Sequence, residues 1–138
     1  MPAKSSAKKK LSRGQQRDLD TKIAFIEGLV RRDPNYVDAL QILGDHYTQR
    51  GRIPEGLKVD ERLARLEPGN PLVFYNLACS YSLSGAMDQA AQALEKALQL
   101  GYRDFDWLAR DPDLKPLRGH AAFDDLKAKI RRLQAKSR

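Results

Sequence analysis

The sequence predicts an all-α protein, a helical solenoid of about seven helices, from three observations. The middle of the chain repeats with a period of 34 residues, and each matched pair keeps its size or chemical type. Apolar residues recur within each repeat at the three- and four-residue spacing of one helix face. Glycine falls between the two helical stretches of each repeat, where a helix end favours a left-handed residue. The matched pairs are Pro34 with Pro68, Leu43 with Leu77, Gly44 with Ala78, Tyr47 with Tyr81, Gly51 with Gly85, Gly56 with Ala90 and Leu66 with Leu100.

The first expected element is a single helix over residues 18–33. Its apolar residues include Ile23, Ile26 and Val30, and Pro34 follows its end. The helix ends in register with the second helix of each repeat. We therefore interpret it as an N-terminal cap on the array.

Two full repeats follow, over residues 37–70 and 71–104, and each is expected to be a pair of helices. The expected helices span residues 37–50, 53–66, 71–84 and 87–100. Gly44 and Gly56 are small, and the equivalent positions of the second repeat hold alanine. Two helices joined by a short turn approach closely only where their side chains are small. The pattern therefore predicts that each repeat is a tightly packed helical hairpin.

Residues 105–126 are expected to cap the array instead of forming a third repeat. A short helix is expected from Phe105, but Pro112 and Pro116 forbid a long one. A final amphipathic helix is then predicted by Phe123, Leu126, Ile130 and Leu133. The end of an array must cover the apolar face of its last repeat. The side chains expected to provide this cover are Trp107, Leu114, Leu117 and Phe123.

Basic residues are concentrated at the two ends of the chain. The formal net charge is +7, and the sequence pI is near 9.7. Residues 1–17 hold six cations and no acid, and so do residues 127–138, which leaves residues 18–126 net acidic. Because residues 1–17 contain few apolar side chains, we expect them to form a disordered basic tail before one helical domain over 18–126. Residues 127–138 are expected to be the basic end of the last helix and a tail.

Each repeat also carries fixed residue types at fixed positions. These are Leu40, Leu43, Gly44, Tyr47, Gly51, Gly56 and Pro68 in the first, and Phe74, Leu77, Ala78, Tyr81, Gly85, Ala90, Leu94 and Ala97 in the second. The pattern resembles the tetratricopeptide repeat family over about residues 20–104, and the C-terminal segment resembles that of small bacterial members. It departs from the family at Asp60 and Leu63, and at Tyr102 instead of a terminal proline. The resemblance implies a right-handed α-α superhelix.

The resemblance also implies a site, because in this family the first helix of each pair lines a concave face that binds peptides. The residues placed on that face are Asp38, Gln41, Asp45, Thr48, Leu72, Tyr75, Asn76, Cys79, Ser82 and Arg110. The groove would be acidic at one end, with Tyr75 at its centre as an aromatic anchor. The alternative is a solvated surface on which Tyr75 seals a neighbouring element.

Some members of the family hold an acidic chain terminus with a carboxylate clamp. Of the positions that match this clamp, only Asn76 and Arg110 carry the expected residue types. Asp45 and Asp106 occupy two others and would repel a carboxylate. The sequence therefore favours a protein or peptide ligand that is basic or neutral.

Enzymatic chemistry finds little support in the sequence. Ser80, His46 and Asp45 occur without a nucleophile elbow, and there is no glycine-rich phosphate loop. His46, Cys79 and His120 lack metal-ligand spacing. We therefore expect a non-enzymatic adaptor or scaffold without metal or cofactor.

The sequence also limits the expected location and assembly of the chain. The single cysteine fits a reducing compartment, and no apolar run is long enough to span a bilayer. We therefore expect a cytoplasmic chain without membrane contact. A monomer or weak homodimer is expected, because two repeats alone make a marginal array.

The basic ends provide the alternative function, which is association with nucleic acid or the ribosome. Cationic contacts to phosphate would make such binding strongly salt-dependent. A third possibility is that a basic end docks on the acidic body of the same or another copy. The residues that would carry the alternative are Lys8, Lys9, Lys10, Arg13, Lys129, Arg131 and Arg132.

Overall fold

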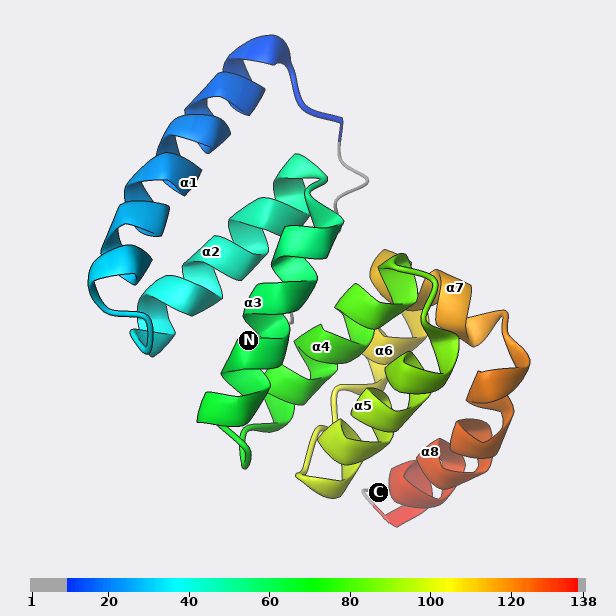
Figure 1. Ribbon diagram of the computed structural model, residues 1–138. Helices are drawn as coiled ribbons and strands as arrows, with labels where there is room; N and C mark the ends of the chain where they lie inside the picture. Colours follow the sequence, from blue (N-terminus) through cyan, green and yellow to red (C-terminus); the bar gives the residue numbers. More distant parts are fainter. Residues whose placement is uncertain (1–9, 137–138) are drawn as a thin grey trace. The chain divides into compact units, whose positions relative to one another are not determined.

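A computed structural model describes residues 10–136, and this part of the chain is all-α, which confirms the predicted fold class (Figure 1). Eight α-helices and two 3-10 turns form it, one α-helix more than expected, because prolines divide the C-terminal segment into short pieces. The helices are α1 (Arg13–Arg32), α2 (Val37–Arg50), α3 (Ile53–Leu66), α4 (Pro71–Leu83), α5 (Met87–Gln99), α6 (Phe105–Arg110), α7 (Lys115–Arg118) and α8 (Asp124–Lys136). None of them has the length and apolar character needed to cross a membrane.

The chain divides after Pro68 into two compact units. In the first unit, α1, α2 and α3 pack in sequence order (Figure 1). Helix α1 begins at Arg13, which corrects the expected boundary at residue 18. Ser12 and Gln15 form a capping box, in which the Ser12 hydroxyl accepts from the Gln15 N–H at 3.1 Å. Residues 1–9 of the predicted basic tail lie outside the described residues.

Helices α2 and α3 approach closely through their glycines, as predicted. A Cβ on Gly44 would lie 3.3 Å from Val59 Cγ1, and a Cβ on Gly56 would lie 3.1 Å from Thr48 Oγ1. The turn between the helices uses Gly51, whose φ is 84°. Glycine adopts this left-handed conformation without the steric cost that a Cβ brings. The first repeat is therefore a tight hairpin.

The second unit begins at Gly69 and starts with the hairpin of α4 and α5. The side chain of Asn70 caps α4 by accepting from the Leu72 N–H at 3.0 Å. Gly85 forms the turn with a φ of 82°. Ala78 and Ala90, which match the two glycines of the first hairpin, are completely buried. The period of 34 residues thus corresponds to two hairpins of the same design.

The C-terminal segment continues as α6, a 3-10 turn, α7, a second 3-10 turn and α8. Helix α6 starts at Phe105, in the predicted register. Leu114, Leu117 and Phe123 are buried, as expected of a cap, while Trp107 is half-buried. We call residues 105–118 the cap; it packs on α4 and, through α7, on α5.

Candidate binding surfaces

One face of α2 carries the exposed part of the predicted site in the first unit. Asp38 and Gln41 are exposed, and Asp45 is half-buried and accepts from the Gln49 amide at 3.0 Å. Ile42 lies at the sixth position of the helix and is 45% exposed. A large apolar side chain is thus left in solvent among acidic and polar neighbours. We call Asp38, Gln41, Ile42 and Asp45 the α2 face.

Thr48 does not belong to the exposed α2 face, which corrects its expected role. Its side chain is 1% exposed, and its hydroxyl donates to the Gly44 carbonyl at 3.0 Å. The same oxygen lies against Gly56 of α3. Thr48 therefore fills the space between the two helices of the hairpin.

The corresponding face of α4 is covered by the chain's own cap. The sequence places Tyr75, Cys79 and Ser82 along an open groove, but all three are completely or almost completely buried. The Tyr75 hydroxyl donates to Asp111 Oδ2 at 2.7 Å, and Ser82 Oγ accepts from the Leu117 N–H at 3.2 Å. The cap thus covers the α4 positions at which the family resemblance predicts a peptide groove. Tyr75 seals a neighbouring element, in agreement with the alternative interpretation.

Asp111 is the centre of this contact and is completely buried. Its Oδ1 accepts from the Asp113 N–H at 2.9 Å, and the Cys79 thiol lies 3.6 Å from its Oδ2. Its backbone carbonyl accepts from Arg118 at 2.8 Å. Asp111 therefore contacts three elements. They are the start of the first 3-10 turn, the end of α7, and the face of α4 that carries Tyr75 and Cys79, which we call the inner face of α4.

Two tyrosines stack beside this contact. The rings of Tyr75 and Tyr102 lie 4.2 Å apart at an interplanar angle of 11°. Burial raises the pKa of both hydroxyls above its ordinary value, and the neighbouring Cys79 and Asp111 raise the pKa of Tyr75 further. Both hydroxyls therefore remain protonated at neutral pH, and Tyr75 keeps the proton that it donates to Asp111.

Cys79, Asp111 and Asp113 also bring three potential metal-ligand atoms within 4.8 Å of one another. The sequence offers no metal-ligand spacing for Cys79. Both carboxyl oxygens of Asp111 accept hydrogen bonds from the protein, one from Tyr75 and one from the backbone. Because these bonds already use the central carboxyl group, we interpret the cluster as the polar core of the cap.

The remaining expected residues of the second unit stay accessible to different degrees. Leu72 and Asn76 are half-buried, and Arg110 is exposed. Arg110 donates to the Asp106 carbonyl at 3.3 Å within α6. These three side chains do not complete a groove, because the cap covers the middle of α4.

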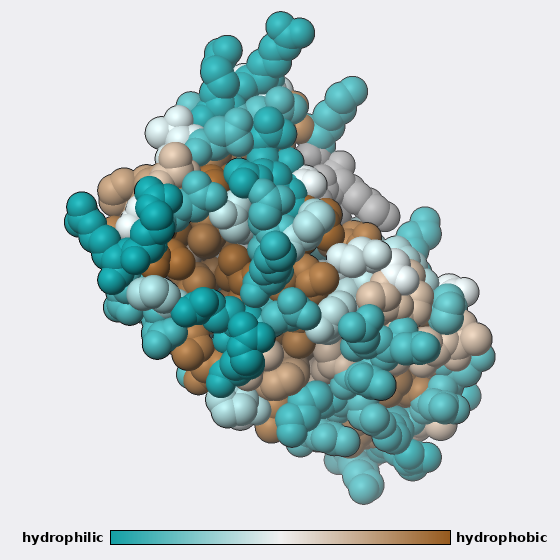
Figure 2. Space-filling model, in the orientation of Figure 1, coloured by the Kyte–Doolittle hydropathy of each residue, from teal (hydrophilic) through white to brown (hydrophobic). Residues whose placement is uncertain are grey.

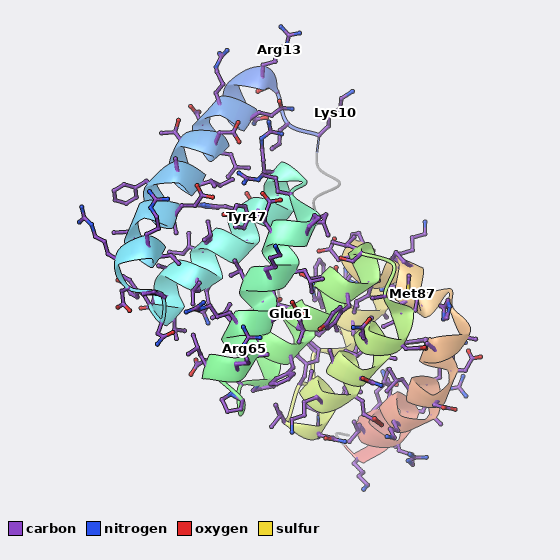
Figure 3. The ribbon with its side chains drawn as sticks, in the orientation of Figure 1. Lys10, Arg13, Tyr47, Glu61, Arg65 and Met87 are labelled. Carbon is purple, nitrogen blue, oxygen red and sulfur yellow. The ribbon has the colours of Figure 1, made fainter. Side chains whose placement is uncertain are left out.

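A polar network ties together the three helices of the first unit. The Tyr47 hydroxyl donates to Glu27 of α1, and the Arg52 guanidinium lies 4.7 Å from the centre of the Tyr47 ring. Arg52 also pairs with Glu55 of α3. Burial, and next the hydrogen bond to Glu27, raises the pKa of Tyr47 to about 12. Figure 3 labels Tyr47 on α2.

Because the pKa of Tyr47 is raised in the folded protein, we expect the protein to lose stability at alkaline pH. The folded pKa of Tyr47, about 12, lies above the ordinary value near 10, so its contribution to stability is complete below pH 10 and is lost as pH rises through about 12. Between these values the free energy of unfolding should fall more for the wild type than for Tyr47→Phe. Urea unfolding of both proteins at several pH values measures this. Parallel pH profiles of the free energy of unfolding for the two proteins would contradict a raised pKa of Tyr47 in the folded state.

The described basic residues near the two ends lie in different surroundings. Lys10 and Arg13 are exposed near the start of α1 (Figure 3), and Lys8 and Lys9 lie outside the described residues. Lys129 and Arg132 line a pocket between α5 and α8, whereas the exposed Arg131 is not among its lining residues. We call this the α5–α8 pocket. Its lining residues are Glu95, Leu98, Gln99, Arg103, Lys129, Arg132, Leu133 and Lys136.

Comparison with known proteins supports the helical-repeat interpretation. No family model matches the chain. The chain is 35% identical over 86 residues to a chloroplastic protein of Arabidopsis thaliana, and these residues make up 60% of this chain and 26% of that protein. It is 35% identical over 94 residues to the peroxisomal targeting signal receptor of Komagataella phaffii, and these residues make up 67% of this chain and 16% of that protein. The human PEX5-related protein is 27% identical over 107 residues, which is 78% of this chain and 16% of that protein.

The chain has a tetratricopeptide-like helical fold. The two helical hairpins agree with the similarity to a targeting signal receptor and to a PEX5-related protein, and together they support a module for protein–protein interaction. The chain spans about a quarter or less of the length of these relatives.

Proposed function

We propose that the chain is a non-enzymatic protein-binding module that holds a basic or neutral protein segment on the α2 face. The observation that carries the proposal is the exposure of Ile42 between the two aspartates of that face. The corresponding face of α4 is already filled by the cap. Among the relatives, several are named as receptors for a targeting signal, which favours a short protein segment as the ligand.

The chemistry of the α2 face determines which segment fits. Ile42 offers apolar surface, and burial of such a side chain against a ligand contributes about 1 to 2 kcal/mol. Asp38 and Asp45 lie four and three residues from Ile42, so they flank it on one side of the helix. A segment with an apolar side chain next to lysine or arginine would satisfy both features.

A charge reversal with a matched control tests this proposal. Asp38 and Asp88 both hold the second position of a helix, on α2 and α5, and both are exposed. A peptide library displayed on phage is selected on the full chain, and the enriched peptides are synthesised for fluorescence anisotropy. We expect Asp38→Lys to weaken their binding by about fivefold or more, and Asp88→Lys to leave it within about twofold.

A second variant separates the apolar contact from the charge. Ile42→Ala should weaken the same peptides by about fivefold, because the side chain loses most of its apolar surface. Circular dichroism of each variant verifies that the helices persist. Equal losses for Asp38→Lys and Asp88→Lys, or peptides indifferent to both Asp38→Lys and Ile42→Ala, would overturn the assignment to the α2 face.

A further inference from the structure

The α5–α8 pocket is an open hollow whose lining holds four cationic side chains and one acidic one. Its volume is about 360 Å³, within the range of protein ligand sites. Helix α8 is joined to α5 by the ion pair of Lys129 with Glu95. Among the described residues, no acidic side chain pairs with Arg132 or Lys136. The pocket therefore keeps cationic groups available for an anionic ligand.

The cations are arranged as a row along α8. Lys129, Arg132 and Lys136 lie on one side of this helix, and neighbours in the row are separated by about 4.5 to 6 Å along the helix axis. Arg103 adds a fourth cation, which is held at the end of α5 by hydrogen bonds of 2.9 and 2.8 Å to the Leu98 and Tyr102 carbonyls. A row of this spacing fits an extended chain with repeated charges, because alternate side chains of an extended peptide lie about 6.7 Å apart.

The pocket also contains apolar residues. Leu98 of α5 is almost completely buried and Leu133 of α8 is half-buried, and both line the cavity. None of the described residues that line it is aromatic. Nucleic-acid bases are usually held by stacking on aromatic side chains, whereas an aliphatic side chain packs well on leucine. The lining therefore favours a protein segment over a nucleic acid.

From this geometry we propose that the α5–α8 pocket binds an acidic protein segment, with an apolar side chain of the segment packed on the accessible part of Leu133, beside Leu98. Carboxylates of the segment pair with Arg132, Lys136 and Arg103. This site goes beyond the proposed function, because it is a second surface and selects the opposite charge from the α2 face. Figure 1 shows α8 (red) beside α5 (yellow-green).

The direct test is the binding of designed probes to the full chain at low ionic strength. The probe is a short fluorescein-labelled peptide in which glutamate and leucine alternate. Two matched peptides replace glutamate by glutamine or leucine by serine, and an oligothymidine of equal charge represents nucleic acid. We expect the glutamate–leucine peptide to bind at least about tenfold more tightly than each of the other three.

Neighbouring residues on α8 provide the matched control. Arg132→Glu reverses a charge in the pocket, and Arg131→Glu reverses the next charge outside it. Arg132→Glu should weaken the peptide about tenfold or more, and Arg131→Glu by no more than about twofold, because an exposed charge outside the contact is screened. Helical circular dichroism of both variants confirms that they are folded.

Three results would overturn the proposal. Equal losses from the two variants would mean that the peptide is held by diffuse charge and not by the pocket. Tighter binding of the oligothymidine would assign the cations to nucleic acid. Equal affinity for the leucine and serine peptides would remove the apolar contact.

Discussion

Replacement of Asp111 by alanine should lower the free energy of unfolding of the second unit by about 3 kcal/mol. The substitution leaves two buried donors without their acceptor, the Tyr75 hydroxyl and the Asp113 N–H, and each such group costs about 1 to 3 kcal/mol. For a unit of this size the melting temperature should fall by more than about 10 °C. Thermal unfolding followed by the fluorescence of Trp107, which lies in the same unit, measures the change.

Asp106→Ala is the control for this prediction. Asp106 lies on the same cap, in the first turn of α6, but its side chain is exposed. Its removal should cost less than about 1 kcal/mol, the usual contribution of an acid near a helix start. A melting temperature for Asp111→Ala that matches the wild type would contradict the central position of Asp111 in the cap.

Replacement of Ile23 by alanine should have the largest effect in the first unit, about 3 kcal/mol. Ile23 is 2% exposed, and among the described residues of α1 only Ile23 and Leu19 are buried. Removal of a buried isoleucine costs about 2 to 5 kcal/mol through lost apolar contact and the cavity left behind. Urea unfolding followed by circular dichroism measures the loss.

Phe25 provides a control of similar size on the same helix. It is two residues from Ile23 but is 67% exposed, so Phe25→Ala removes a large side chain from solvent and not from the core. It should change the free energy of unfolding by less than about 0.5 kcal/mol. Similar losses for Ile23→Ala and Phe25→Ala would show that α1 does not pack on α2 through the predicted face.

The sequence predicts the hairpins closely because two local signals agree there. Apolar spacing defines the helices, and Gly51 and Gly85 adopt the left-handed conformation that ends the first helix of each pair. The observed bounds of α2 and α3 equal the expected ones, and α4 and α5 each end one residue earlier. The start of α1 is missed because Ser12 and its capping partner lie within a basic, weakly apolar segment that resembles a disordered tail.

The binding surfaces are harder to predict, because periodicity identifies a helix face but not what covers it. Asp111 before Pro112 is a recognisable helix-start signal, and its side chain does accept from the Asp113 N–H. Nothing local indicates its bond to Tyr75, 36 residues away. Ile42 could have been found, because it lies four residues after Asp38 and three before Asp45, on the helix face that both were expected to occupy.

Helical periodicity also does not tell which apolar residues of a helix remain at the surface, as Figure 2 illustrates. The face that it presents has apolar surface over the α1–α3 unit, interrupted by charged side chains. The residues around a cavity of about 370 Å³ in this unit include Val30, Leu40 and Val59, with Lys58 and Arg62 among the charged ones. Helical periodicity assigns these apolar residues to the core. Leu40 and Val59 are indeed buried, whereas Val30 is only half-buried.

The filling of the inner face of α4 by the cap is tested most directly by the chemical reactivity of Cys79. This is the single cysteine of the chain, and its side chain is completely buried beside Asp111. An aromatic disulfide reagent should react with native protein only at the rate of unfolding, and in full denaturant at the rate of a free thiol. Reaction of the native protein at the free-thiol rate would show that the inner face of α4 is open.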